Sequence, residues 1–188
     1  MKIHLSNYDY LRNFDVFLRG FDTSEPEKLS ITTNDKWISA HPAILTLIAA
    51  LGIKVKPENI KFDDITARSG HYLDVMGLFK ILGKDSPFKV ESHEPAGRYI
   101  PLTQIKTPKQ QTHFIHEMIP LLHLEPEKAD AIKYTVGELV RNVLEHANAP
   151  DGAIVAAQYS REQGIIRLGI CDTGIGIRSS MNRIWPAQ

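Results

Sequence analysis

Residues 138–146, ELVRNVLEH, and residues 172–177, DTGIGI, are the two stretches that decide the fold of this chain. The first stretch spaces Glu138, Asn142 and His146 so that one helical turn separates each from the next, which aligns them along one side of a helix. The second stretch is a glycine-rich turn that follows an apolar segment. Each pattern is common alone, but their order and spacing make the two informative together.

The first motif lies in a stretch that we predict to be a helix over residues 125–147. Its apolar side chains recur at the helical period and gather on one side. They are Ile132, Val136, Leu139, Val140, Val143 and Ala147. Glu138, Asn142 and Glu145 gather roughly opposite, within a sector of about 60° at 100° per residue. This polar stripe is suited to hold a metal–phosphate group.

The side chains of both motifs have the chemistry that a magnesium nucleotide requires. Mg²⁺ prefers oxygen ligands and is usually held by one or two protein oxygens together with phosphates, and Asn142 can supply such an oxygen. Glu138, one turn earlier, is the candidate general base. Asp172 can accept a hydrogen bond from the exocyclic amine of adenine. Gly174 and Gly176 allow the backbone to turn tightly and to approach the base.

At these residues the chain resembles the GHKL ATPase superfamily, over roughly residues 98–180. The resemblance implies an ATP-binding α/β sandwich. In that superfamily a helical E-x-x-x-N motif supplies the general base and the magnesium ligand, which implies these roles for Glu138 and Asn142. The cofactors that it implies are therefore ATP and Mg²⁺.

The D-x-G-x-G box of the superfamily binds adenine, which implies that Asp172, Gly174, Gly176 and the adjoining Ile177 form the base site. The N-x-x-x-H spacing that ends at His146 looks most like that of the anti-sigma-factor serine kinases, and it implies that His146 lies near the phosphates. The alternative for His146 is a helix C-terminal histidine that interacts with the helix dipole.

The expected fold class is α/β (an α+β sandwich) with two domains. Residues 1–95 are expected to form a small STAS-like α/β domain, and residues 98–188 a GHKL-type domain with a mixed sheet covered by helices. The polar stretch 84–97, interrupted by proline and glycine, separates them. In the first domain we expect strands at 29–33 and 60–63 and helices at 42–51 and 71–82, the second ending at Gly83. In the second we expect strands at 98–102, 153–159 and 165–171 and helices from Thr107-Pro108 to 123 and from 125 to 147.

The first domain is similar to a STAS domain because a strand at 62–65 precedes Ser69-Gly70 and an apolar helix. In STAS domains a D-S-S-G segment opens that helix and its serine is phosphorylated by a partner kinase. A phosphate at a helix N-terminus is physically reasonable, since backbone N–H groups and the helix dipole favour it. The alternative is that Ser69 is the N-cap of the helix.

Composition excludes several classes. The chain has 188 residues and equal numbers of acidic and basic side chains, so it lacks the positive charge that non-specific nucleic-acid binding requires. No apolar run is long enough to cross a bilayer. The single cysteine, Cys171, indicates a reducing compartment, and a small buried strand residue is the favoured interpretation of it. We therefore expect a cytoplasmic protein.

Four residues of one predicted helix and its end, His113, His116, Glu117 and His123, suggest a phospho-accepting histidine or a metal cluster. Neither fits well. His116 is too close to Glu138 to leave room for a dimerisation hairpin, and the H-E-x-x-H zinc pattern has Pro120 in place of its second histidine. We interpret these side chains as a helix surface.

The function that these observations favour is a signalling protein that binds Mg-ATP and phosphorylates a protein serine, with a protein partner and with a homodimer left open. The alternative is a non-catalytic nucleotide-gated switch or protein-interaction module. An ATP-driven dimer clamp fits less well. Because the sequence ends at Gln188, before any lid or second glycine box, we expect it to be part of a longer protein.

Overall fold

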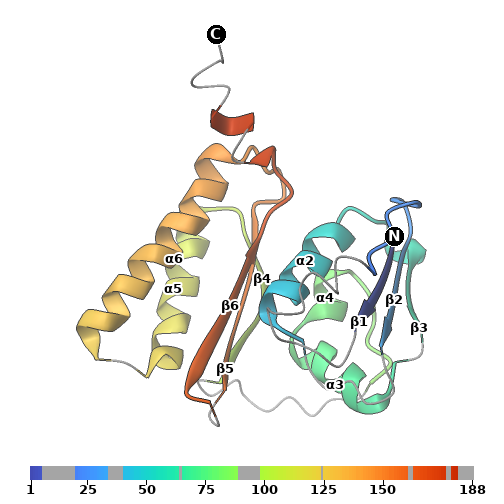
Figure 1. Ribbon diagram of the computed structural model, residues 1–188, viewed down its shortest axis with the longest axis horizontal. Coiled ribbons are helices and arrows are strands. Elements are labelled where there is room, and N and C mark those ends of the chain that lie inside the picture. The colour runs from blue at the N-terminus through green and yellow to red at the C-terminus, as the bar shows by residue number, and fades with distance from the viewer. Residues whose placement is uncertain are drawn as a thin grey trace.

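The computed structural model describes residues 1–5, 20–33, 40–63, 65–88, 98–123, 125–160, 163–176 and 179–181. These residues form two three-stranded sheets with helices between them and on one side (Figure 1). The order of layers is a helical pair, an antiparallel sheet, a group of helices and a parallel sheet. The predicted α/β (α+β) class is confirmed.

The parallel sheet contains β1 (Lys2–Leu5), β2 (Leu29–Thr33) and β3 (Ile60–Asp63) in that order. Both β2 and β3 have the predicted bounds, whereas β1 was not predicted. Alternate residues of each strand are buried against the helices, as the two-residue period of a strand requires. The opposite face is polar, and there Ser30 Oγ donates a hydrogen bond to Asp63 Oδ2 at 3.0 Å.

The helices of this part are α2 (Pro42–Gly52), α3 (Ala67–Val75) and α4 (Leu78–Ile81), with a short 3₁₀ turn, η2, at Pro57–Asn59. The prediction of one helix over 71–82 was wrong. Gly77 has a φ of 77°, a left-handed conformation that ends one helix and begins the next. Gly83, where we expected the helical segment to end, has a φ of 65°, the left-handed conformation usual for a glycine that follows a helix.

The interpretation of Ser69 as an N-cap was also wrong. The N-cap of α3 is Thr66, whose side chain accepts a hydrogen bond from the Ser69 backbone N–H. Ser69 itself lies in the first turn with no exposed surface, and its Oγ accepts a hydrogen bond from Thr66 Oγ1 at 2.9 Å. A kinase would reach this hydroxyl only after the helix start had opened.

The antiparallel sheet contains β4 (Tyr99–Ile105), β5 (Ala153–Ser160) and β6 (Ile165–Cys171) in that order. Both of its pairings are antiparallel, where we expected a mixed sheet. The strand β4 is longer than predicted and tolerates Pro101 because only one of its sides is paired among the described strands.

One face of this sheet is covered by α5 (Pro108–Leu122) and α6 (Pro126–His146). A capping box starts α5, because Thr107 and Gln110 satisfy each other's backbone N–H groups. The two helices are joined by a hydrogen bond of 2.7 Å from Gln111 Nε2 to the Gly137 carbonyl. Within the described residues, no helix has the length and apolar character that crossing a membrane requires.

The opposite face of the antiparallel sheet is covered by α2, which comes from the N-terminal part. The strand β5 therefore contributes to two apolar clusters. Ile154 and Ala156 join the cluster of the N-terminal part, whereas Ala153, Val155 and Ala157 join the cluster beneath α5 and α6. Because α2 packs on both sheets, the first of these two clusters contains residues from both expected domains.

Candidate functional site

The loop that carries the D-x-G-x-G motif meets the C-terminal end of α6 directly after His146, whereas Glu138 lies about two and a half helical turns before this contact (Figure 1). The Ile175 backbone N–H donates a hydrogen bond of 2.8 Å to the Ala147 carbonyl, which is the C-cap residue of α6. This bond satisfies one of the carbonyl groups that a helix end leaves without an intrahelical partner. It also fixes the loop after β6 to the helix that carries Glu138, Asn142 and His146.

Position 174 requires glycine because there is no space for a side chain. A Cβ atom added at this position would lie 2.1 Å from the Ala147 carbonyl oxygen, far inside van der Waals contact. Gly176 is required by conformation instead, because its φ is 74° while no atom lies within 4 Å of its added Cβ. Glycine is therefore needed at the two positions of the predicted box for different physical reasons, which are the lack of space at 174 and the backbone conformation at 176.

Asp172 leads this loop and is half-buried. Its Oδ1 accepts a hydrogen bond of 2.8 Å from the Gly174 backbone N–H, which closes a local turn. Its Oδ2 has no hydrogen-bond partner among the described residues. One carboxylate oxygen thus holds the loop while the other is available to an outside donor.

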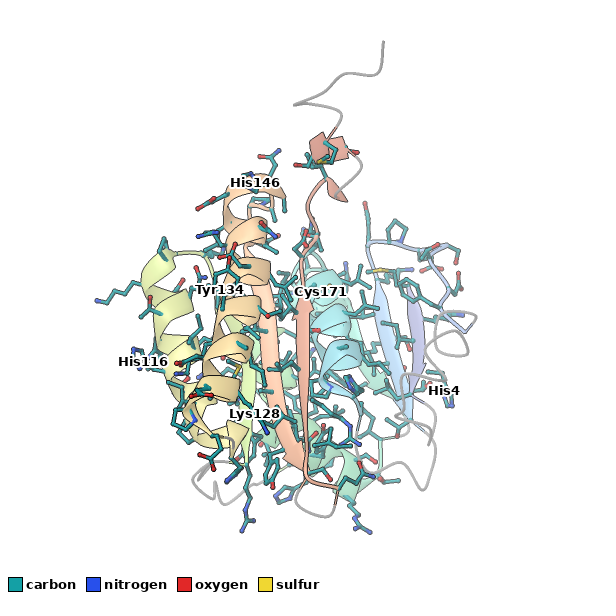
Figure 2. The ribbon with its side chains drawn as sticks, turned by 60° about the vertical axis from the view of Figure 1, so that its left-hand side comes forward. His4, His116, Lys128, Tyr134, His146 and Cys171 are labelled. Carbon is teal, nitrogen blue, oxygen red and sulfur yellow. The ribbon has the colours of Figure 1, made fainter. Side chains whose placement is uncertain are left out.

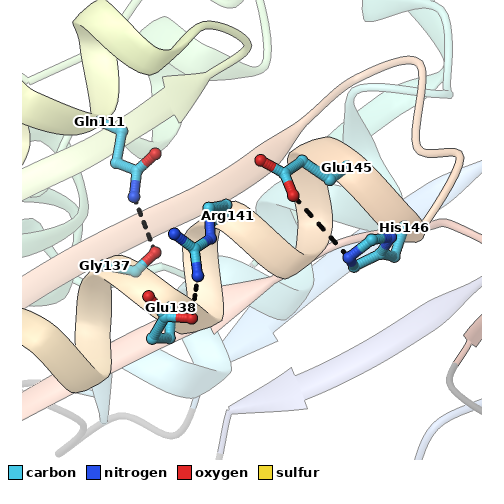
Figure 3. Close-up of polar contacts among 6 residues, drawn as sticks. All are labelled: Gln111, Gly137, Glu138, Arg141, Glu145 and His146. Atoms are coloured by element: carbon cyan, nitrogen blue, oxygen red, sulfur yellow. Dashed lines mark hydrogen bonds and ion pairs between the residues drawn. The ribbon is translucent and has the colours of Figure 1, made fainter.

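On α6 the candidate base is already paired. The Arg141 guanidinium donates a charge-assisted hydrogen bond to Glu138 Oε2 (Figure 3), and the Glu138 side chain is 31% exposed. Asn142 is exposed, and its side chain has no hydrogen-bond partner within the described ranges. His146 is exposed too, with its Nε2 3.8 Å from Glu145 Oε2. Sequence analysis did not single out Arg141, although its place one turn after Glu138 could have indicated the pair.

The structure corrects the assignment of Leu139 to the apolar face of α6. Leu139 is 49% exposed. It lies about 200° around the helix from Gly137, which faces α5, and so it projects from the flank that α5 leaves uncovered. Asn142 lies about 60° away on this same flank. The flank therefore combines an exposed apolar side chain with an exposed amide.

Two side chains beside Asp172 have unusual surroundings. Cys171 ends β6 and packs on the core shared with α2 (Figure 2). Burial, and then the neighbouring Asp172 carboxylate, raise the pKa of its thiol to about 11. Thr173 Oγ1 is buried without a hydrogen-bond partner in the part of the chain that the structure describes. Sequence analysis missed Thr173, because nothing in the motif distinguishes a satisfied hydroxyl from an unsatisfied one.

The described residues contain no group of three or more His, Cys, Asp or Glu side chains that could hold a metal ion. His116 is exposed on the outer surface of α5 (Figure 2). His113 is exposed on the same helix, with its Nε2 3.6 Å from Glu117 Oε1. A magnesium ion held chiefly by phosphates needs only one or two protein oxygens, and the unpaired Asn142 amide fits that requirement. The last predicted site residue, Ile177, lies outside the described residues.

Comparison with protein-family models, with curated proteins and with solved structures finds no match to this chain.

Proposed function

We propose that this protein binds Mg-ATP where the C-terminal half of α6 meets the loop after β6. The observation that carries the proposal is the contact of Gly174 and Ile175 with Ala147, because it brings the D-x-G-x-G loop to the helix that bears the E-x-x-x-N motif. Without this contact the two motifs would be separate surface features.

Each side chain has a role that its surroundings support. Asp172 Oδ2 would accept a hydrogen bond from the exocyclic amine of adenine, while Oδ1 keeps the loop closed. Leu139 would offer apolar contact area at the edge of the site. Asn142 would hold Mg²⁺, which neutralises charge on the phosphates, and His146 would lie beside the phosphates.

If the protein transfers the terminal phosphate, the acceptor proposed here is a serine hydroxyl of a protein partner. Glu138 would then orient that hydroxyl and accept its proton as the oxygen–phosphorus bond forms and the bond to the leaving ADP breaks. Glu138 would first have to exchange its bond with Arg141 for one with the acceptor. A signalling role belongs to the same proposal and rests on the resemblance alone, whereas the proposed cytoplasmic location rests on the single cysteine and on the short apolar runs of the sequence.

A second candidate function is a non-catalytic switch, in which nucleotide binding changes the affinity for a partner. The specific observation in its favour is the Glu138–Arg141 pair, because a carboxylate bonded to Arg141 is not positioned to meet an acceptor hydroxyl. Nucleotide binding would be shared by both functions, but turnover would not.

Calorimetric titration with ATP, ADP and GTP, with and without Mg²⁺, tests the proposal. We expect Mg-dependent ATP binding in the wild type, loss of the Mg dependence in Asn142→Ala, and weaker ATP binding relative to GTP in Asp172→Asn. Asp130→Asn is the matched control, since it makes the same carboxylate-to-amide change on an exposed side chain in the second turn of α6. Wild-type protein that binds no nucleotide in any of these titrations would contradict the proposal.

Phosphate release and phosphoprotein formation separate the two functions once binding has been established. If Glu138 is a base, Glu138→Gln should abolish turnover and leave the ATP dissociation constant within about twofold. A protein with no turnover in either form would instead be a switch.

A further inference from the structure

The Thr173 hydroxyl is an unsatisfied polar group in the middle of the candidate base-binding loop. Its Oγ1 is buried and has no hydrogen-bond partner among the described residues. Buried polar groups in native proteins almost always have a partner, and each exception needs an explanation. A buried hydroxyl without a partner lowers the stability of the fold that contains it.

The loop holds Thr173 in this position from both sides. On one side, Asp172 Oδ1 accepts the Gly174 N–H at 2.8 Å. On the other, the Ile175 N–H is bonded to the Ala147 carbonyl at 2.8 Å, and Gly174 lies against that same carbonyl. Thr173 is therefore not at a fraying end where an unfavourable contact could simply relax.

Packing alone does not require the hydroxyl. Valine has nearly the shape of threonine, and replacing an unpaired buried hydroxyl by a methyl group of similar shape can be neutral or stabilising. A threonine at this place is explained if its hydroxyl has a partner in another state of the protein. The adjacent Asp172, with one carboxylate oxygen directed to no described residue, indicates that this state is the bound one.

We propose that Thr173 is a base-binding residue of the nucleotide site, whose hydroxyl donates a hydrogen bond to a ring nitrogen of adenine when ATP is bound. This inference rests on the proposed function. Adenine presents a donor, its exocyclic amine, next to an acceptor, ring nitrogen N1. An ionised carboxylate only accepts, whereas a hydroxyl can donate, so Asp172 and Thr173 together match this pair of groups.

The same pair of residues meets guanine differently. Guanine presents a carbonyl acceptor where adenine has the amine, so two acceptors would face each other and the hydrogen bond to Asp172 would be lost. The protonated ring nitrogen of guanine would require the Thr173 hydroxyl to accept instead of donate, which a hydroxyl can do, so discrimination against guanine comes from Asp172. Because Thr173 Oγ1 is buried in the free protein, binding includes a rotation of the Thr173 side chain that brings the hydroxyl to the base, while the two hydrogen bonds of the loop stay in place.

The test compares Thr173→Val, which removes the hydroxyl and keeps the shape, with Thr173→Ser, which keeps the hydroxyl. ATP dissociation constants are measured by calorimetry and unfolding midpoints by thermal denaturation of the free protein. We expect Thr173→Val to weaken ATP binding about tenfold, as for one lost hydrogen bond to a ligand, without lowering the unfolding midpoint. Thr173→Ser should bind ATP within about threefold of the wild type.

A change in the ligand tests the same bond without relying on the folding of a variant. In 1-deaza-ATP the ring nitrogen N1 is replaced by a C–H group, so the wild type should bind it about tenfold more weakly than ATP. Thr173→Val should bind the two nucleotides equally, because the bond is already absent.

Three outcomes would overturn the inference, and they can be told apart. Equal ATP affinities in wild type and Thr173→Val, with weaker ATP binding in Asp172→Asn, would contradict the proposed role of Thr173 but would still support a nucleotide site at this loop. A lowered unfolding midpoint in Thr173→Val would mean that the hydroxyl is bonded in the free protein. Wild type that binds no nucleotide would overturn the proposed function and this inference with it.

Discussion

Strand β6 and the loop after it place a glycine against a backbone carbonyl at two points, and the two contacts have different surroundings. A Cβ added at Gly169 would lie 2.4 Å from the Pro42 carbonyl oxygen, and one added at Gly174 would lie 2.1 Å from that of Ala147. The Gly169 contact is buried between β6 and the start of α2, whereas the Gly174 contact lies in a half-buried loop. The first joins the two parts of the fold, and the second positions a candidate site.

Cys171 lies between Gly169 and Gly174 in the sequence, so the reactivity of its thiol depends on the packing around these contacts. Because the pKa of its thiol is raised from 9.0 to about 11, the reactive thiolate is about 100 times scarcer below pH 9 than in the unfolded chain. We expect iodoacetamide to label the folded protein at pH 8 at least about 100-fold more slowly than the urea-unfolded protein, since burial adds to the effect.

The sign of the pH dependence follows from the same pKa. Between pH 9 and 11 the unfolded thiol has lost its proton and the folded thiol has kept it, so the free energy of unfolding should decrease across this range. Cys171→Ala should remove that part of the decrease. Equal labelling rates for folded and unfolded protein would mean that the core shared with α2 does not enclose Cys171.

Gly169→Ala tests whether the buried contact joins the two parts of the fold. The added methyl group must displace the start of α2, so the free energy of unfolding should decrease by about 2 kcal/mol, as for other overpacked cores. Urea denaturation measures it. The control is Gly164→Ala in the β5–β6 turn, where the surroundings are open and only the φ of 61° is strained. If the free energy of unfolding decreases no more in Gly169→Ala than in Gly164→Ala, the start of α2 moves away from β6 without destabilising the fold.

Gly174→Ala tests the second contact, and here we expect the larger effect on binding. The loop can leave Ala147 by giving up the Ile175 hydrogen bond, so the free energy of unfolding should decrease by only about 1 kcal/mol. ATP affinity should decrease at least about tenfold, because the loop no longer lies beside α6. Wild-type affinity in this variant would separate the candidate site from the contact that we propose creates it.

Sequence reasoning predicted the elements that carry local signals and missed those that depend on distant contacts. Thr107, Pro108 and Pro126 mark helix starts, and both helices begin where these residues indicate. The α3–α4 break was missed because nothing around Gly77 distinguishes a helix break from an interior glycine. The strand β1 was missed because its four residues give too short an alternation of polar and apolar side chains.

The core shared between the two parts was equally hard to predict, although α2 carries one sign of it. Buried residues lie all around α2, including Thr46, which has no exposed surface. A helix that is apolar all round is buried on more than one side. Sequence alone did not reveal that its second partner would be β5 and β6. For the site, the sequence indicated the two motifs, but it did not indicate that the Thr173 hydroxyl is buried without a described hydrogen-bond partner or that Leu139 is exposed.

Gly137→Ala should change the free energy of unfolding least, and in the opposite direction. It shows whether any glycine-to-alanine change in this region is destabilising, or only a change at the close contacts of Gly169 and Gly174. Gly137 lies inside α6 beside Glu138, and a Cβ there would lie 3.5 Å from Ile115 Cδ1, an ordinary contact. Since glycine is a poorer helix former than alanine, the free energy of unfolding should increase by about 0.5–1 kcal/mol, and the Gln111 bond to the Gly137 carbonyl should persist. ATP affinity should not change. A destabilised Gly137→Ala would mean that the space between α5 and α6 also does not accommodate a methyl group. A close steric contact at a glycine would then not be a feature that distinguishes the candidate site.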